Sequence, residues 1–367
     1  MKFNNLSPFL MLLLPFVLTG CNDDNDFTNI LKDNEHQIIE WINDDNYDKD
    51  YYATSTYKPN QPLFEPVLAI QRKRWDIARP LLEKLVSKND PDAMYWLATI
   101  SGGDVFSGSV MADLFSRSAR LGNPYSALRL SPGAEDCNSY LKGYCSDKWK
   151  DVALDIFGKK AKNGDVKAKY FLEKLKGKKD NELLSVILDN ARNHYFFPLY
   201  NYVSYNPYMK NKKELYSIMA KHRFIPVGHL MYLNIDFDDF DYSFYSGILE
   251  QIKLSGSSWY SVFNINSKFN EIGKKKEYFK QMLLSSYVLR LIENASYIKG
   301  NLSELPKDNV SLFDEISKDY NRDLVHYKIE KFTQYELSNI KDEAIESFRQ
   351  VKPIIYIDEY YYDPGKI

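Results

Sequence analysis

A motif that occurs twice between Asp113 and Leu172 constrains the fold more than any other feature of the chain. The pattern Asp-x-Phe-x-x-x-Ala-x-x-Gly begins at Asp113 and again at Asp155, and each copy is followed eight positions after its glycine by Leu130 or Leu172. Repetition at a period of a few tens of residues is typical of stacked helix pairs. We therefore expect an all-α chain built as an array rather than as a catalytic globule.

Weaker copies extend the motif in both directions. Each contains a small residue, a turn residue three positions later, and core positions four and eight beyond the turn. The series reads Val86-Asn89-Ala93-Leu97, Ala119-Gly122-Ser126-Leu130, Ala161-Gly164-Ala168-Leu172, Ala191-His194-Pro198-Tyr202, Ala220-Arg223-Val227-Met231 and Ile252-Ser255-Trp259-Phe263. Turn residues lie 33, 42, 30, 29 and 32 positions apart, the length of two short helices and two turns. Gly or Asn suits a left-handed helix end, and Ala allows close helix packing.

This pattern resembles the Sel-like repeat family, relatives of tetratricopeptide repeats, over roughly residues 75–175. The matching scaffold positions are Ala93, Leu97, Ala119, Gly122, Leu130, Ala161, Gly164, Ala168 and Leu172. Later copies depart from the family by placing His194 and Arg223 at the turn and Pro198 at a small position. The resemblance implies an α-solenoid over residues 63–265. Helices predicted within Phe269–Lys299 and Val310–Gln350 would form a C-terminal helical cap over residues 266–352, since an open array exposes an apolar end.

The first twenty-one residues have the pattern of an export signal. Lys2 precedes an apolar run from Phe9 to Leu18, too short to span a bilayer, so residues 1–20 are predicted to be a cleaved signal peptide. Leu18-Thr19-Gly20-Cys21 resembles the lipobox of bacterial lipoproteins, which implies that Cys21 carries the lipid anchor. A buried or disulfide-bonded Cys21 is the alternative. Asn22 is not the usual inner-membrane retention residue, so we expect the periplasmic face of the outer membrane rather than the inner membrane.

The segment that follows is acidic. Residues 22–52 contain ten Asp and Glu side chains against Lys32 and Lys49. We predict a solvated tether over residues 21–62 with a short amphipathic helix near Phe27–Ile42; an acidic patch that docks a basic partner is the alternative. The whole chain has a formal charge of −2, which gives no general attraction to nucleic acid.

Cys137 and Cys145 lie between the two best motif copies. With Cys21 assigned to lipid, the remaining cysteine count is even, and an oxidising periplasm permits a disulfide, so we predict that they pair. The same spacing in cysteine-rich Sel-like proteins supports this pairing.

Two charged stretches are candidate contact surfaces. Residues 159–179 contain nine lysines and two acids, which favours a solvated outer helix face over a basic surface for an acidic partner or lipid phosphates. The acidic stretch Asp236, Asp238, Asp239 and Asp241 lacks the glycine and glutamate of an EF-hand, so we interpret it as an exposed loop available for partner contact. A calcium site is the alternative there. We expect no metal, no cofactor and no catalytic residues, because no zinc, nucleophile-elbow, Walker or Rossmann motif occurs.

The chain ends in a tyrosine-rich tail over residues 353–367. The run after Pro353 changes from helical to extended character. Tyr356, Tyr360, Tyr361 and Tyr362 would suit either a contact strip for a partner or a terminal strand that lies back on the body.

These features favour a non-enzymatic protein-binding scaffold anchored to a membrane by its N-terminal lipid. The resemblance sharpens this expectation, because exported Sel-like proteins include immunity proteins that neutralise phospholipase effectors of type VI secretion. An envelope assembly or signalling adaptor is the first alternative, and a hydrolase with an unrecognised site is the second.

Overall fold

The computed structural model describes residues 34–44, 50–102, 107–206, 209, 211–227, 275–295, 297–298, 301–302 and 305–361. These residues are all-α apart from a two-residue ladder. The first helix covers 34–43, and the others are α2 (Phe64–Gln71), α3 (Trp75–Val86), α4 (Pro91–Thr99), α5 (Ser107–Arg120), α6 (Pro124–Arg129), α7 (Glu135–Asn138), α8 (Lys148–Lys162), α9 (Val166–Leu175), the 3₁₀ turn η1 (Asp180–Leu183), α10 (Leu184–Arg192), α11 (Phe197–Tyr205), α12 (Lys212–Lys221), α16 (Lys275–Asn294), α17 (Asn309–His326) and α18 (Gln334–Gln350).

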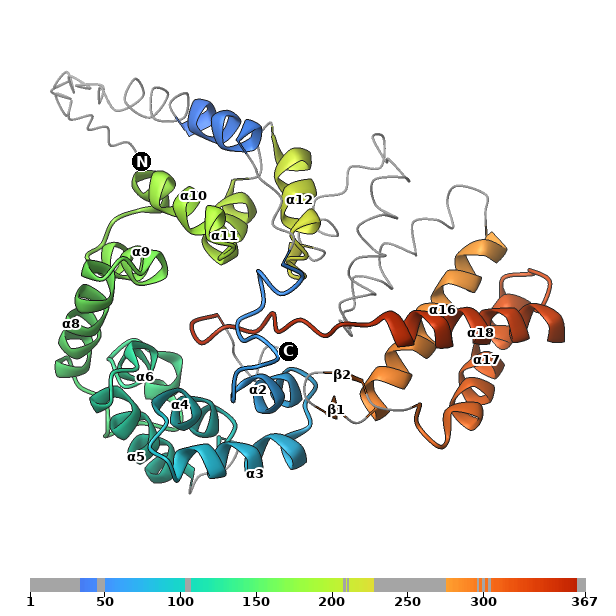
Figure 1. Ribbon diagram of the computed structural model, residues 1–367, viewed down its shortest axis with the longest axis horizontal. Coiled ribbons are helices and arrows are strands. Elements are labelled where there is room, and N and C mark those ends of the chain that lie inside the picture. The colour runs from blue at the N-terminus through green and yellow to red at the C-terminus, as the bar shows by residue number, and fades with distance from the viewer. Residues whose placement is uncertain are drawn as a thin grey trace, which may run out of the picture.

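Helices that follow one another in the chain pack against one another. Each helix from α2 to α6 contacts the next one, α6 contacts α8, and each helix from α8 to α11 contacts the next one. Figure 1 shows these pairs arranged as an arc from α2 to α12. One continuous core of buried apolar side chains extends from Ile38 to Val227 inside this arc and includes Ile355 and Ile357. The prediction of an all-α chain with sequentially paired helices is confirmed.

The turn residues predicted from the motif are the residues at which the helices end. Asn89, Gly122, Gly164, His194 and Arg223 all have positive φ, between 60° and 102°. At each of these turns the turn N–H donates to the carbonyl three residues earlier, and the next N–H donates to the carbonyl five residues before it. This is the Schellman arrangement that satisfies the last carbonyls of a helix. The copies at His194 and Arg223 therefore keep the turn geometry without glycine, whereas the copy at Ser255 lies outside the described residues.

The residue after the turn caps the next helix in the three better-matched copies. Asp90, Asn123 and Asp165 accept a hydrogen bond from the backbone N–H three residues later at 2.8–2.9 Å. Such caps stabilise a helix by about 1 kcal/mol. The two later copies place Tyr195 and Phe224 at this position instead, and α11 has no side-chain cap. Three residues after the cap, the N3 positions Ala93, Ser126 and Ala168 are buried, which explains why they are small.

An insertion explains the long spacing of 42 between Gly122 and Gly164. It contains the short helix α7 and the disulfide between Cys137 and Cys145, whose Cα atoms lie 6.0 Å apart. The predicted pairing of these cysteines is confirmed. Asp136 of α7 also forms a 2.8 Å ion pair with Arg129 of α6, and both side chains are more than four-fifths buried. The insertion is thus fixed to the array at two adjacent points.

The helices α16, α17 and α18 form a second bundle with a core of its own. That core contains Phe279, Tyr287, Leu324 and Ile340, among others. The region Val310–Gln350, for which the sequence allowed one long helix or two shorter ones, forms two. The strands β1 (Tyr297–Ile298) and β2 (Asn301–Leu302) pair antiparallel between α16 and α17. Arg72, which directly follows α2, donates to the carbonyl of Ile292 at 3.1 Å and so joins this bundle to the α2 end of the array.

The described part of the acidic N-terminal segment is packed rather than solvated. In the helix over 34–43, Ile38 and Trp41 are buried in the array core, and Asn34 donates to the hydroxyl of Tyr202 in α11 at 3.2 Å. Residues 50–62 likewise contact the body through the buried ring of Tyr57. The amphipathic helix predicted near Phe27–Ile42 is therefore present over residues 34–43. The prediction of a solvated tether is wrong for residues 34–44 and 50–62, because the apolar face of that helix packs into the array core. The other residues of the predicted tether lie outside the described ranges.

Candidate functional site: the inner face of the array

The inner face of the arc is occupied by the end of the chain itself. After α18 ends at Gln350, residues 353–361, here called the C-terminal segment, run as extended chain into the middle of the arc (Figure 1). Ile354, Ile355 and Ile357 are buried there, at 5% exposure or less. Of the two interpretations of the tyrosine-rich tail, the structure thus shows a segment that lies back on the body, although it is not assigned as a strand.

Residues of α2 and of the segment before it satisfy much of the backbone of the C-terminal segment. The amide of Gln71 in α2 donates to Ile354 O at 3.0 Å and accepts from Tyr356 N at 2.8 Å. The Thr56 N–H donates to Ile355 O, and the Ser55 hydroxyl accepts from Ile355 N, both at 3.0 Å. A buried extended chain needs such partners, because an unpaired backbone group costs about 1–3 kcal/mol. These contacts hold the chain in the way a groove holds a bound peptide.

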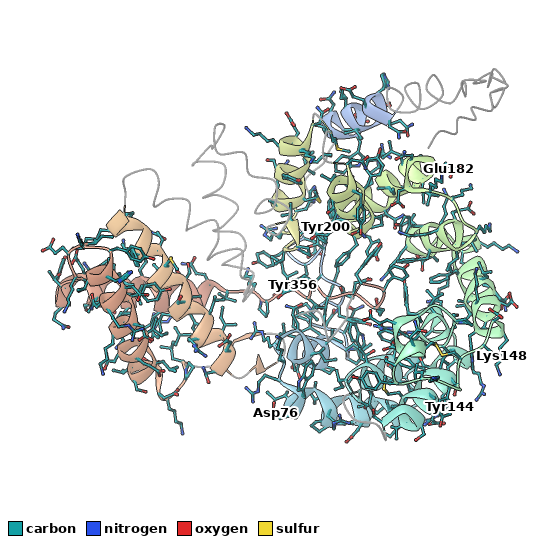
Figure 2. The ribbon with its side chains drawn as sticks, turned by 180° about the vertical axis from the view of Figure 1, so that it is seen from behind. Asp76, Tyr144, Lys148, Glu182, Tyr200 and Tyr356 are labelled. Atoms are coloured by element: carbon teal, nitrogen blue, oxygen red, sulfur yellow. A yellow bond between two sulfur atoms is a disulfide. The ribbon has the colours of Figure 1, made fainter. Side chains whose placement is uncertain are left out.

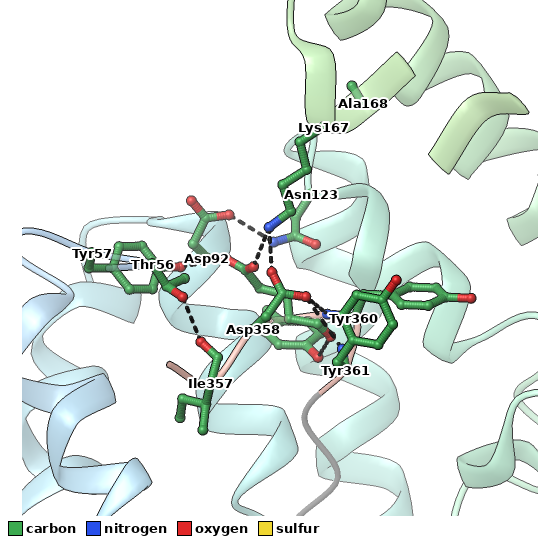
Figure 3. A network of polar contacts seen from close by, with 12 residues as sticks. Thr56, Tyr57, Asp92, Asn123, Lys167, Ala168, Ile357, Asp358, Tyr360 and Tyr361 are labelled. Atoms are coloured by element: carbon green, nitrogen blue, oxygen red, sulfur yellow. Dashed lines mark hydrogen bonds and ion pairs between the residues drawn. The ribbon is translucent and has the colours of Figure 1, made fainter. Parts of the chain in front are cut away.

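A pair of adjacent carboxylates lies at the centre of the inner face. Figure 3 shows Lys167 reaching from α9 toward Asp358, and its ammonium lies 2.6 Å from Asp358 Oδ2 and 3.0 Å from Glu359 Oε2. The side chain of Asp358 is 1% exposed and that of Glu359 is 9% exposed. Three formal charges are therefore brought together largely away from water, where an isolated charge is costly and a paired one is retained.

The pKa values of these groups differ because their surroundings differ. Burial raises the pKa of Asp358, and the charge of Glu359 adds to this effect despite the attraction of Lys167. Burial acts in the same direction on Glu359, but Lys167 and the donated hydroxyl of Tyr57 outweigh it and lower its pKa. Burial alone would lower the pKa of Lys167, yet the two carboxylates raise it well above its usual value. Lys167 and Glu359 are thus the firmly charged members of the cluster.

Neutral donors complete the recognition of Glu359. The Tyr57 hydroxyl donates to Glu359 Oε1 at 2.7 Å and accepts from the Trp96 indole N–H at 3.1 Å. Burial, followed by the charge of Glu359, raises the pKa of Tyr57 well above its usual value, so this hydroxyl stays a donor. The Tyr95 hydroxyl donates to the backbone carbonyl of Glu359 and accepts from Arg129 at 3.1 Å. The cluster is therefore held by side chains from α4, α6, α9 and the segment before α2.

Aromatic rings hold the last residues of the segment. The ring of Tyr360 lies 4.6 Å from that of Phe171, and the ring of Tyr361 stacks on Phe197 at 5.0 Å with an interplanar angle of 16°. Both contacts come from helices that follow the turns at Gly164 and His194. Figure 2 shows Tyr200 and Tyr356 on the inner side of the arc, with Tyr144, Lys148 and Glu182 on its outer edge.

One position of the repeat supplies the inner face, and the sequence analysis missed it. The third residue after the turn faces inward in four successive copies, at Asp92, Tyr125, Lys167 and Phe197. Of these, Lys167 and Phe197 contact the C-terminal segment directly. The ring of Tyr125 lies 5.0 Å from the Lys167 ammonium. Asp92 accepts from Asn123 at 2.7 Å, and its pKa is raised by burial and then by the charge of Glu359. This position could have been recognised in the sequence, because it lies directly before the small position of each copy.

The other predicted site residues have varied positions. Among the scaffold positions, Ala93, Leu97, Ala119, Leu130 and Ala168 are buried, whereas Ala161 and Leu172 are partly buried against the same core. Tyr356 is half-buried and Tyr360 is 38% exposed. Cys21, Asp236, Asp238, Asp239, Asp241 and Tyr362 lie outside the described residues.

A hollow lies between the helix over 34–43 and the ends of α10 and α12. It has a volume of about 530 Å³ and is lined by Trp41, Asn43, Asp44, Ala191, Arg192, His194 and His222. The rings of His194 and His222 are 5.3 Å apart. Within the described ranges, no group of three or more His, Cys, Asp or Glu side chains is placed to hold a metal ion. In the same part of the chain, no helix combines the length and apolar character needed to cross a bilayer.

No family model, no curated protein and no solved structure matches this chain.

Proposed function

We propose that this protein is a lipid-anchored scaffold that faces the periplasm, and that it acts as an immunity protein by binding and neutralising a phospholipase effector of type VI secretion. The fold we propose is a Sel-like, tetratricopeptide-like solenoid whose C-terminal bundle serves as its cap. The observation that carries the proposal is the repeat register, with its positive-φ turn at Asn89, Gly122, Gly164, His194 and Arg223. Repeat arrays of this kind work by presenting extended surfaces to other proteins. The lipobox-like Leu-Thr-Gly-Cys21 supports the anchor.

The surface we assign to the partner is the outer, basic edge of α8 and α9, although the sequence by itself favoured a merely solvated face there. The lysines at 148, 150, 160, 162 and 169 are exposed along these helices. The inner face, by contrast, is already filled by the C-terminal segment. A basic edge on a chain of net charge −2 favours an acidic partner surface and steers its approach. Within the Sel-like resemblance, that partner is the effector.

Binding is tested with purified protein that begins at Asn22 and with the lipase encoded beside its gene. We expect a one-to-one complex by light scattering and loss of phospholipid hydrolysis on vesicles. Lys160→Glu combined with Lys162→Glu should weaken the complex, because both side chains lie on the basic edge. Lys318→Glu combined with Lys331→Glu makes the same charge change at exposed positions in the second bundle and should leave binding unchanged.

A test in cells separates this proposal from the other classes. A strain that lacks the gene should be killed by sister cells that carry the effector, and should survive when their secretion system is removed. Envelope defects without any attacker would favour an adaptor instead. Turnover of a lipid, peptide or glycan by the purified protein would indicate a hydrolase and contradict the proposal.

A further inference from the structure

We propose that the inner face of the array is a binding site for an extended peptide that carries two adjacent carboxylates followed by aromatic residues, and that residues 353–361 are its resident, exchangeable occupant. This inference concerns a different surface from the basic edge of α8 and α9. It does not depend on the immunity function.

The inner face binds this segment through features that any extended peptide would offer. Gln71 contacts the carbonyl of Ile354 and the N–H of Tyr356, while Ser55 and Thr56 contact the N–H and carbonyl of Ile355. Backbone hydrogen bonds of this type supply affinity, and side-chain pockets between them supply selectivity. The segment makes these contacts without forming a helix or a strand of its own.

Selectivity comes from the carboxylate pair. Lys167 contacts both Asp358 and Glu359, and Tyr57 donates to the second oxygen of Glu359. The ammonium of Lys167 also lies 5.0 Å from the ring centre of Tyr125 and 4.6 Å from that of Tyr195. Two aromatic faces and two anions therefore fix one cation in a position that suits adjacent acidic residues. A peptide with lysines at these two places would leave three like charges buried together.

The aromatic residues that follow have their own positions. Phe171 lies against Tyr360 and Phe197 stacks on Tyr361, and aromatic pairs of this kind contribute about 0.5–1.5 kcal/mol beyond the area they bury. The order of features along the groove is thus apolar, acidic and then aromatic. The sequence Ile-Ile-Tyr-Ile-Asp-Glu-Tyr-Tyr of residues 354–361 is the template for the ligand.

The position of the segment in the chain makes exchange possible. It follows α18, whose bundle has a separate core that ends at Val351. Release of residues 353–361 therefore leaves that bundle's own core intact. A segment linked in this way competes at an effective concentration on the order of millimolar, so a free peptide cannot enter until the linked one is weakened.

The test uses the full chain and a fluorescent peptide with the sequence of residues 353–361. Asp358→Lys combined with Glu359→Lys should expel the resident segment by repulsion from Lys167. The peptide should then bind at least tenfold more tightly than it binds the wild-type chain, measured by fluorescence anisotropy. Asp342→Lys combined with Glu343→Lys changes the same dipeptide at exposed positions of α18 and should behave as the wild type.

Two further measurements make the result decisive. Adding Lys167→Met to the first variant should reduce peptide binding at least tenfold, and a peptide with Lys-Lys in place of Asp-Glu should not bind the first variant. Equal peptide binding by the folded variant and the wild type would overturn the proposal. If the variant does not fold, hydrogen exchange on the wild-type chain tests the proposal instead. The amides of Ile355, Tyr356 and Tyr360 should exchange at least tenfold faster than those of α9; exchange only together with α9 would show that the segment is an inseparable part of the fold.

Discussion

The turns at Gly122 and Gly164 and those at His194 and Arg223 have the same backbone but different chemistry. All of them have positive φ and the same pair of helix-ending hydrogen bonds. The earlier turns use glycine, followed by an Asn or Asp that caps the next helix. The later turns use larger residues followed by Tyr195 or Phe224, which pack instead of capping.

This difference shows that copies of the motif can share a backbone shape without sharing the same local signals. A non-glycine residue in the left-handed region costs about 1–2 kcal/mol, so another interaction must hold it there. In the later copies that interaction is aromatic packing: Phe224 is 3% exposed, and its ring lies 5.1 Å from Phe197 and 5.7 Å from Phe196. Glycine and the capping hydrogen bond that follows it set the earlier turns, and packing in the core sets the later ones.

The largest expected effect comes from substitutions at the residue after the turn, which test whether packing sets the later turns and capping sets the earlier ones. Phe224→Ala should destabilise the array by about 3–5 kcal/mol, because it removes a buried aromatic ring. Asp165→Ala, at the equivalent position of an earlier copy, should cost about 1 kcal/mol through loss of a helix cap. Urea unfolding followed by hydrogen exchange measures both, with α11 and α12 reporting on the first variant and α9 on the second. Equal costs would contradict the comparison.

The turns could be predicted from the sequence, whereas the return of the tail to the body was only one of two alternatives and its position on the inner face could not be predicted, for a physical reason. A Schellman turn is specified by residues within six positions of one another, so its pattern recurs even where His194 replaces glycine. The contact between Lys167 and Asp358 joins residues 191 positions apart. An extended segment of nine residues has no helical period that could identify its partners. Only the array side of that contact had a signal in the sequence, namely the repeated inward-facing position occupied by Lys167 and Phe197.

The second prediction concerns the charged and aromatic contacts of the C-terminal segment on the inner face. Glu359→Gln should destabilise the chain by about 1.5–3 kcal/mol at pH 7, because it weakens hydrogen bonds made by charged groups. The folded-state pKa of Glu359 is lowered. Its stabilising effect is therefore present above its unfolded value of about 4.3 and is lost as the pH falls through the lower folded value.

Two variants provide the contrast for this pH effect. The pKa of Asp358 is raised, so protonation at falling pH favours the folded state through this residue, and Asp358→Asn should cost less at pH 7 than Glu359→Gln. Phe197→Ala should destabilise by the same amount across the range, because its stacking on Tyr361 carries no charge. Thermal unfolding between pH 3 and pH 7 distinguishes the three. Parallel pH profiles for Glu359→Gln and the wild type would show that this carboxylate does not govern the acid response.

The smallest expected effect separates the backbone requirement from packing. An added Cβ at Gly164 meets no atom within 4 Å, yet φ there is +90°, so Gly164→Ala should cost about 1–2 kcal/mol through conformation alone. Gly158, six residues earlier inside α8, also has open space but ordinary helical geometry, and Gly158→Ala should stabilise by about 0.5–1 kcal/mol. His194→Gly relieves the left-handed strain but loses the contact with His222, so its net effect should be below about 1 kcal/mol in either direction. Changes of opposite sign in the free energy of unfolding for Gly158→Ala and Gly164→Ala, measured by thermal unfolding, would establish that glycine sets the earlier turns through φ. A large loss of stability in His194→Gly would instead show that the imidazole ring itself helps to hold the later turns.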